Sequence, residues 1–348
     1  MIKNNSPFII WTFRRSGGTN LGDSLFNNSK YNAVEHEPFN VDRRFNYVIN
    51  KWNNEKNIDV LYSDIEEIIK NKPLIKHCLE IMPSELNTAL LEISTKYGYK
   101  HLFLYREMAK SRLLSLNYSI KTNVWGKEHL LTRPFDDAVF DEKIPIEKLI
   151  EHERVARESM KSLYSKLVEL KQKPLSVSFE QLYRSDFSYS SLLVRSLFKE
   201  LIGSDEFVSE EFLDKTLRGG GQGTNGDYLR FPNSDDFIAR MDDLDRFKLY
   251  EDKEVKHNAK EKHCIEYFEL WKTLPGINSE QFYIHGVCLS SKPFNLAFRQ
   301  SQIEIIRGLK SDNMHRRFPE HIHAQHCRFI AGPIEGIDNL NIDIIFCN

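Results

Sequence analysis

The chain is poor in cysteine, nearly balanced in charge and free of long hydrophobic runs, and each of these shortages excludes a class of protein. Its five cysteines are scattered, odd in number and without a Cys-x-x-Cys pair, so neither a disulfide framework nor a zinc site is predicted. A formal net charge of -2 provides no overall field that would attract nucleic acid or a membrane surface. The apolar run at residues 7–13 is too short to span a bilayer, and no signal peptide precedes it. We therefore expect a cytoplasmic protein, in a reducing compartment, with no nucleic acid partner, no transmembrane segment and no metal.

The rest of the composition is that of a globular protein, with 41% hydrophobic and 28% charged residues among 348. Short apolar runs predict buried strands at Phe8–Thr12, Leu74–His77, His101–Tyr105 and Leu175–Phe179. Helical spacing of apolar residues predicts helices between them at Asp64–Asn71, Ser84–Tyr97 and 146–171. This alternation predicts an α/β fold with a central parallel sheet flanked by helices.

The C-terminal part of the chain has a different pattern. A glycine-rich stretch at 219–223 predicts a mobile loop, and helical patterns follow at 234–250 and 256–274. From Phe282 onward, short β-like runs separated by turns predict a small antiparallel sheet or sandwich. This last region ends on a strand pattern and is expected to continue beyond the sequence. The domains that we expect are 1–278 and a small β-rich domain at 279–348.

The first predicted strand runs into a loop of small residues with two arginines, and a helical pattern begins at Leu21. Glycines let successive backbone N–H groups point toward one anion, and the following helix adds its positive end. The residues predicted to hold an anion here are Arg14, Arg15, Ser16, Gly17, Gly18, Thr19 and Asn20. The lysine of the usual nucleotide-triphosphate loop, Gly-x-x-x-x-Gly-Lys-Ser/Thr, is missing. The alternative interpretation is a glycine-containing strand-to-helix turn with surface arginines.

A second arginine, Arg106, stands at the end of a predicted strand, and Ser115 lies along the helical pattern Glu107–Asn117 that follows. Guanidinium is the natural bidentate partner of phosphate, so this arginine and serine can close on one phosphate. Both regions resemble motifs of one family, the bacterial carbohydrate sulfotransferases. Arg15-Ser16-Gly17-Gly18-Thr19 resembles their 5′-phosphosulfate loop. The segments similar to their 3′-phosphate motif are Leu104-Tyr105-Arg106-Glu107, Leu114-Ser115-Leu116 and Lys121-Thr122-Asn123-Val124-Trp125-Gly126.

The resemblance covers motifs within roughly residues 7–235 and implies a P-loop-like sulfotransferase fold and activity. It implies 3′-phosphoadenosine-5′-phosphosulfate as the sulfuryl donor, with Arg106 and Ser115 holding its 3′-phosphate and no metal. The segment Leu217–Gly221 is weakly similar to the loop that covers this phosphate, which adds Arg218 to the cofactor-binding residues; a flexible acceptor lid is the alternative. The acceptor implied is a hydroxyl group of a small molecule or glycan, with carbohydrate favoured.

Sulfuryl transfer to a hydroxyl needs a cation at the leaving oxygen and a base for the acceptor proton. Arg15 matches the position where many sulfotransferases carry a catalytic lysine. Glu37 resembles the catalytic glutamate of carbohydrate sulfotransferases and is the favoured base, with Glu35 close behind. Lys76-His77 ends the second main strand pattern, so His77 is a further candidate base and Lys76 a clamp for the sulfuryl group. Because adjacent residues of a strand face opposite ways, we expect only one of these two to face the site.

Two other functions are compatible with an anion-binding loop of this kind. A P-loop kinase would need a loop lysine and acidic residues for magnesium near the phosphates, and neither is evident in the loop. A non-catalytic nucleotide- or glycan-binding module would keep the anion-binding loop without turnover. The sequence therefore predicts a sulfotransferase first, with these two alternatives.

Overall fold

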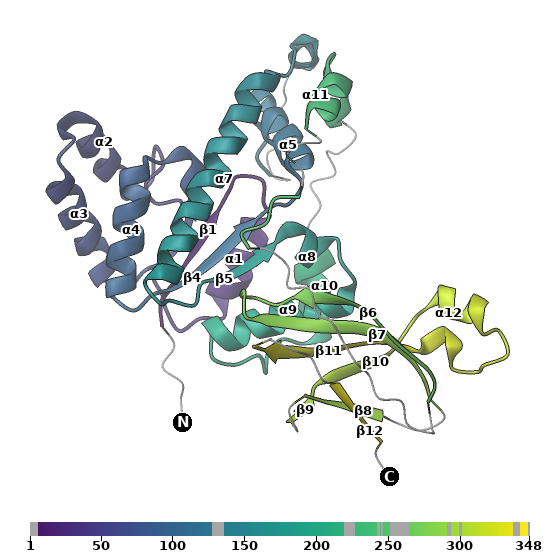
Figure 1. The fold of residues 1–348 in the computed structure, drawn as a ribbon. Helices are drawn as coiled ribbons and strands as arrows, with labels where there is room; N and C mark the ends of the chain where they lie inside the picture. Colours follow the sequence, from purple (N-terminus) through teal and green to yellow (C-terminus); the bar gives the residue numbers. More distant parts are fainter. Residues whose placement is uncertain are drawn as a thin grey trace. The chain divides into compact units, whose positions relative to one another are not determined.

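The computed structural model describes residues 6–126, 136–218, 227–241, 244, 246–250, 265–290, 294–298, 301–336 and 342–346. The chain divides into two compact units, each drawn in Figure 1. The first consists of Met1–Ser185 and Val194–Leu249, and the second of Asp186–Leu193 and Tyr250–Asn348. The division near residue 250 comes earlier than the expected domain boundary at 278/279, because the strand Ile265–Pro275 belongs to the second unit.

The first unit contains a five-stranded sheet whose strands are all parallel. The strand order is β2 (Val34–His36), β3 (Leu74–Cys78), β1 (Phe8–Thr12), β4 (Lys100–Tyr105) and β5 (Leu175–Ser178). β1 is central and every one of its residues is buried, as its uninterrupted apolar run predicts. The predicted α/β fold with a parallel central sheet flanked by helices is confirmed (Figure 1).

Helices lie between the strands of this sheet and follow its last strand in the sequence. Before β4 they are α1 (Gly18–Asn27), α2 (Asn46–Glu55), α3 (Ile58–Lys70), η1 (Leu79–Ile81) and α4 (Ser84–Lys96). After β4 come α5 (Ala109–Thr122), η2 (Asp137–Asp141), α7 (Ile146–Glu169), α8 (Phe179–Tyr183) and α9 (Phe187–Leu201). The last ones are α10 (Glu210–Arg218), η3 (Asp227–Arg230) and α11 (Ser234–Arg240). Over the described residues, the helix predicted at 234–250 ends at Arg240, and the glycine-rich stretch 219–223 lies outside the described residues.

The two faces of the sheet are covered by different helices, because side chains alternate along a strand. On one face, Ile10 of β1 lies under α1, where a Cβ built on Gly22 would be 3.7 Å from the Ile10 Cδ1 atom. On the other face, Trp11 packs against Phe103 of β4, and Phe103 contacts Tyr164 of α7. The sheet therefore sits in the middle of three layers, and the carboxyl ends of its strands share one edge.

The second unit is built of antiparallel strands. One sheet has the order β10 (Ile305–Leu309), β11 (Arg328–Glu335), β7 (Gln281–Ser290) and β6 (Ile265–Pro275). The other has the order β12 (Ile342–Phe346), β8 (Phe294–Phe298) and β9 (Ser301–Ile303), and the unit also contains α12 (Asp312–Arg317) and η5 (Ala324–His326). The β-like runs predicted from Phe282 onward are confirmed as antiparallel strands.

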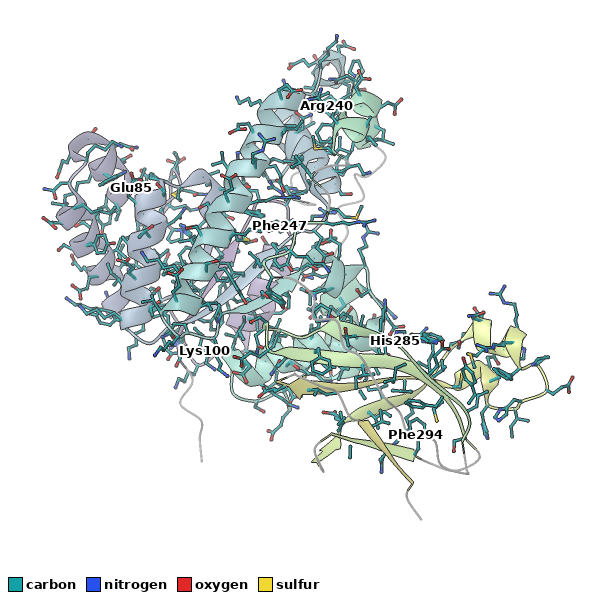
Figure 2. The ribbon with its side chains drawn as sticks, in the orientation of Figure 1. Glu85, Lys100, Arg240, Phe247, His285 and Phe294 are labelled. Carbon is teal, nitrogen blue, oxygen red and sulfur yellow. The ribbon has the colours of Figure 1, made fainter. Side chains whose placement is uncertain are left out.

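The predicted helix at 256–274 is wrong over Ile265–Leu274, which forms most of β6, and its earlier part lies outside the described residues. The apolar residues of this segment satisfy a two-residue period as well as a helical one. Phe268 and Leu270 pack on the core that contains Phe294 and Phe329, whereas Trp271 packs against His285 on the other face (Figure 2). Most of β6 pairs with β7, so the segment adopts the two-residue period of a strand rather than the helical period.

Candidate functional site

The segments that carry the sequence-predicted site all follow neighbouring strands of the parallel sheet. The loop after β1 holds the anion-binding residues, Arg106 follows β4, and Glu37 follows β2. Since parallel strands place their carboxyl ends at one edge, these segments lie together beyond that edge. The contacts described below join the loop after β1 to segments that are distant from it in the sequence.

The loop between β1 and α1 has a strongly curved backbone. Arg15 and Gly17 adopt left-handed conformations, with φ of 66° and 76°. A Cβ on Gly17 would lie 2.9 Å from the Tyr183 ring, so both the conformation and the packing require glycine there. Ser16 is buried, and its Oγ atom has no hydrogen-bond partner within the described part of the chain. A buried hydroxyl of this kind at a helix N-terminus is a donor available to an anionic ligand.

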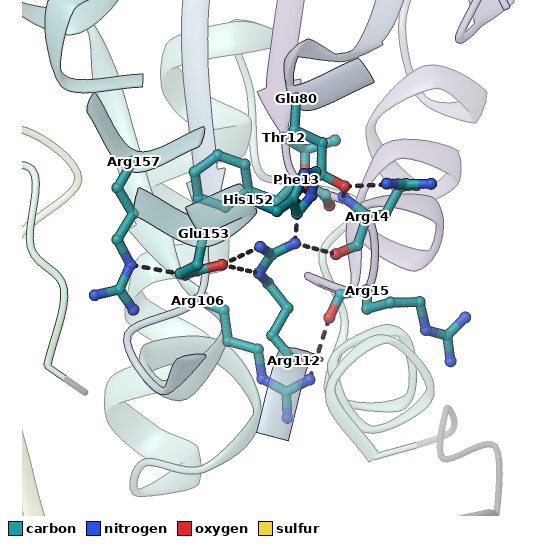
Figure 3. Close-up of polar contacts among 10 residues, drawn as sticks. All are labelled: Thr12, Phe13, Arg14, Arg15, Glu80, Arg106, Arg112, His152, Glu153 and Arg157. Atoms are coloured by element: carbon teal, nitrogen blue, oxygen red, sulfur yellow. Dashed lines mark hydrogen bonds and ion pairs between the residues drawn. The ribbon is translucent and has the colours of Figure 1, made fainter. Parts of the chain in front are cut away.

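Arg14, the first loop arginine, belongs to a buried network of charges (Figure 3). Its backbone N–H and its Nε atom both donate to Glu80 Oε1, at 3.1 and 2.7 Å. Its carbonyl accepts from Arg112 Nη1 at 3.2 Å, and the same nitrogen donates to Glu80 Oε2 at 2.8 Å. Arg112 also pairs with Glu153 of α7, which in turn accepts from Arg157. These contacts fix the first half of the loop to η1, α5 and α7.

The side chains of Arg112, Glu80 and Glu153 are completely buried. Burial lowers the pKa of Arg112, but Glu80 and Glu153 outweigh it and raise that pKa above its usual value. Burial likewise raises the pKa of Glu80, but Arg112, His152 and Arg14 outweigh it and lower that pKa below its usual range. Buried charges are tolerated only when they are paired and hydrogen-bonded in this way, so this cluster is a structural support of the loop.

Arg15, the second loop arginine, has a different environment. Its Nε atom donates to Ser115 Oγ at 2.8 Å, and its Nη1 atom donates to the Trp125 carbonyl at 2.9 Å. Ser115 Oγ lies 3.0 Å from the Tyr228 hydroxyl, with either atom able to donate. Arg106 Nη1 donates to the Arg15 carbonyl at 3.2 Å (Figure 3). Arg15, Ser115 and Tyr228 therefore form one cluster of side chains that can donate to a phosphate, and Arg106 joins it through the backbone carbonyl of Arg15.

Arg106 stacks on the Phe179 ring at 4.1 Å and has its Nε atom 3.7 Å from Glu180 Oε1. Glu180 is itself held by the backbone N–H groups of Glu107 and Met108 at the start of α5. Burial lowers the pKa of Arg106 to about 10, although Glu180 opposes the shift. Burial also lowers the pKa of Arg15, with Tyr228 opposing. Both guanidinium groups stay charged at neutral pH, and a bound anion would offset the desolvation that depresses their pKa values.

Lys76, on β3, places a second positive charge beside the start of α1. The side chain is 8% exposed, and its Nζ atom donates to Thr19 Oγ1 at 3.2 Å and pairs with Glu37 Oε1 at 3.0 Å. A Cβ on Gly18 would lie 3.6 Å from the Lys76 Cδ atom, which shows how closely the lysine runs beneath the helix start. The Glu37 backbone has a left-handed φ of 52°, and its Oε2 atom accepts from Asn40 at 2.8 Å. The structure thus joins the favoured base and the predicted clamp as an ion pair.

The other two candidate bases, Glu35 and His77, have different surroundings. Glu35 accepts from the exposed Arg44 at 2.8 Å. His77 is 1% exposed, lies 2.7 Å from Asn87 Oδ1 through its Nε2 atom, and packs edge-on against Trp11. Burial lowers the pKa of His77 to about 4, with Asn87 and Glu37 opposing. The expectation that only one of Lys76 and His77 faces the loop is confirmed, and it is Lys76.

Two remaining predicted residues have contacts with nearby helices. The Asn20 side chain donates to the Thr216 carbonyl of α10. Arg218 is exposed at the end of α10, where it pairs with Asp214 at 2.9 Å. Gly219–Gly221, the rest of that predicted cofactor loop, lies outside the described residues.

The buried carboxylates and the tyrosine of this region are not predicted from the sequence. Glu80 and Glu153 resemble surface residues in sequence, although Glu80 lies two residues beyond the end of a buried strand, where a carboxylate is a sign of a site at that edge of the sheet. Tyr228 follows the glycine-rich stretch, and nothing in its spacing predicts its contact with Ser115.

Comparison of the chain with protein-family models gives no match, and comparison with curated protein sequences gives none either. None of the helices within the described residues combines the length and apolar character that a membrane crossing requires. Within the same residues, no group of three or more His, Cys, Asp and Glu side chains is arranged to hold a metal ion.

Proposed function

We propose that the protein is a sulfotransferase that moves a sulfuryl group from 3′-phosphoadenosine-5′-phosphosulfate to a hydroxyl group, with a carbohydrate as the favoured acceptor. The observation that carries the proposal is the meeting of the loop after β1 with the turn after β4. Arg106 contacts the Arg15 carbonyl, and Arg15 contacts Ser115, so two sets of phosphate donors distant in sequence share one edge of the sheet. A ligand with two separated anionic groups suits such an arrangement better than a ligand with one.

The residues present fit such a nucleotide. Ser16 supplies a buried hydroxyl whose Oγ atom has no partner among the described residues, in a loop whose glycine leaves no room for a Cβ. Arg106 is partly desolvated on the Phe179 ring, so an anion there would gain a strong charge-assisted hydrogen bond. The bound donor would supply an activated sulfuryl group whose leaving group is a phosphate.

Glu37 and Lys76 are suited to the acceptor side of the reaction. In the transfer, the bond from sulfur to the phosphate oxygen breaks, and a bond from sulfur to the acceptor oxygen forms. The acceptor's proton passes to the Glu37 carboxylate, and 3′,5′-bisphosphoadenosine leaves. Lys76, 3.0 Å from that carboxylate, holds it in place and contributes positive charge where negative charge develops. His77 is less suited to this role, because burial keeps it neutral but also keeps it packed against Trp11.

A transfer assay with radiolabelled sulfuryl donor and a panel of sugar and aryl hydroxyl acceptors tests the proposal. We expect labelled product from at least one sugar acceptor in the presence of a chelator of divalent metals. Labelled product from ATP and magnesium in a parallel kinase assay, with none from the sulfuryl donor, would support the kinase alternative. Tight donor binding with no transfer to any acceptor would support the non-catalytic module.

A further inference from the structure

The sequence resemblance assigns Arg15 to the sulfuryl end of the donor, but its contacts lie with the residues assigned to the opposite end. Its Nε atom donates to Ser115 and its Nη1 atom to the Trp125 carbonyl, both within or directly after α5. The left-handed backbone of Arg15 turns its side chain in this direction and leaves its carbonyl to Arg106. One guanidinium group is thereby anchored at two points beside the predicted 3′-phosphate position.

Tyr228 completes the same position. Its hydroxyl lies 3.0 Å from Ser115 Oγ and also bonds the Arg15 side chain. Tyr228 and Ser115 are both buried, and Tyr228 packs against Tyr118 of α5. Two arginines, a serine and a tyrosine are the donor types that bind a phosphate monoester dianion best, because together they offer many N–H and O–H groups and two positive charges.

Lys76 places a cation in contact with the N-terminus of α1. It contacts Thr19, the second residue of that helix, and runs beside Gly18, the first. A lysine in this place supplies the point charge that the usual loop lysine supplies in phosphate-binding loops. Its position on β3 explains why the loop motif itself carries no lysine.

We propose, resting on the proposed function, that Arg15 and Tyr228 are binding residues for the 3′-phosphate, together with Arg106 and Ser115, and that Lys76 alone of these cations serves the 5′ end. The 3′-phosphate and the 5′ end of the donor are then bound by separate sets of residues. Specificity for a nucleotide phosphorylated on its 3′ oxygen depends on the residues that surround Ser115.

Calorimetry with three nucleotides separates the two assignments of Arg15. Adenosine 5′-monophosphate, adenosine 3′-monophosphate and 3′,5′-bisphosphoadenosine are titrated into the full chain and into Arg15→Met, Tyr228→Phe and Lys76→Met variants. A charge-assisted hydrogen bond contributes about tenfold to hundredfold in affinity. We expect Arg15→Met to weaken the 3′-phosphate and the bisphosphate by at least tenfold and to leave the 5′-phosphate within about twofold. Tyr228→Phe should follow the same pattern with a smaller loss, and Lys76→Met should weaken the 5′-phosphate more than the 3′-phosphate.

The matched control is Arg154→Met, since Arg154 is an exposed arginine on α7 paired with Glu151. It should bind all three nucleotides as the unchanged chain does, and unfolding curves for every variant verify that each one is folded. An equal loss of 5′- and 3′-phosphate affinity in Arg15→Met, or a loss confined to the 5′-phosphate, would overturn the inference while the proposed function stands. Failure of the unchanged chain to bind any of the three nucleotides would overturn the proposed function itself.

Discussion

Arg112 and Arg106 are both buried arginines near the same loop, yet they lie in opposite electrostatic surroundings. Arg112 contacts two buried carboxylates, Glu80 and Glu153, and its pKa is raised in spite of burial. Arg106 lies on an aromatic ring with one carboxylate at 3.7 Å, and burial lowers its pKa to about 10. The charges of the first region are therefore already paired, whereas we expect a bound anion to stabilise the second region further.

Arg14 and Arg15, the two adjacent arginines of the loop, differ in the same way: one is bound to a carboxylate and the other to neutral groups. Arg14 is bound to Glu80 through both its backbone and its side chain, so it holds the loop in place. Arg15 is bound to a hydroxyl and a carbonyl, which are neutral acceptors, and it lies beside Arg106.

The largest effect is expected on transfer activity, through the ion pair of the buried Lys76 with the partly exposed Glu37. Glu37→Gln should lower the rate of sulfuryl transfer by about 10²–10⁴, because a general base of the acceptor proton is lost. The variant should bind the donor as the unchanged chain does. Transfer rates and donor affinity, measured side by side, check this. Glu35→Gln is the matched control and should retain activity, while full activity in Glu37→Gln would move the base role to another residue.

Arg112→Met should lower the free energy of unfolding of the first unit by about 3–5 kcal/mol, because Glu80 and Glu153 would remain buried without their shared partner. Arg106→Met, the matched substitution in the other region, should lower it by only about 1–2 kcal/mol. This variant loses the stack on Phe179 and the hydrogen bond to the Arg15 carbonyl, but Glu180 stays bound to the backbone N–H groups of Glu107 and Met108. Denaturant unfolding curves for both variants give these values. Similar destabilisation by both substitutions would remove the distinction between the regions.

A bound anion should stabilise the second region and leave the first unchanged. With 3′,5′-bisphosphoadenosine at a hundredfold its dissociation constant, the free energy of unfolding should rise by about 2.7 kcal/mol. The same ligand concentration should have little effect on Arg106→Met, because that variant lacks a charged contact of the ligand. Thermal unfolding with and without ligand measures both. Equal stabilisation of the two proteins would place the anion elsewhere.

The smallest effect concerns His77, a buried neutral group on the face of β3 opposite Lys76. Its pKa is about 4 in the folded chain, against an ordinary value of 6.5, because burial disfavours the charged form. As the pH falls below 6.5, the unfolded chain takes up a proton that the folded chain does not, so stability is lost toward pH 4. Between pH 7.5 and 5 this one group should account for about 2 kcal/mol.

His101 contributes to the pH dependence in the same direction, since burial lowers its pKa to about 3. His77→Gln should therefore flatten the decline in stability over this pH range without abolishing it. Unfolding curves at several pH values provide the measurement. An unchanged slope in the variant would mean that His77 is not held neutral by burial.

Much of the fold could be predicted because its strands are uninterrupted apolar runs. β1 and β4 are buried on both faces, so a central parallel strand is the structure that suits them. β6 could not be predicted, because its aromatic and apolar residues fit two periods and only pairing with β7 decided between them.

Within the site, the residues of a continuous motif could be predicted, whereas those brought together by the fold could not. Ser16, Arg106 and Ser115 were identified from local patterns. The separate functions of Arg14 and Arg15 depend on Glu80 and Tyr228, which are 66 and 113 positions from their respective partners Arg14 and Ser115. Contacts across such distances leave no local signature in a single sequence.

The central claim is that one doubly phosphorylated adenosine is bound by the loop after β1 and the turn after β4. Calorimetric titration of the unchanged chain with 3′,5′-bisphosphoadenosine and with adenosine 5′-monophosphate, both without magnesium, tests it most directly. We expect the bisphosphate to bind at least about tenfold more tightly, because only it reaches the donors around Arg106 and Ser115. Equal affinity for the two nucleotides would contradict the account.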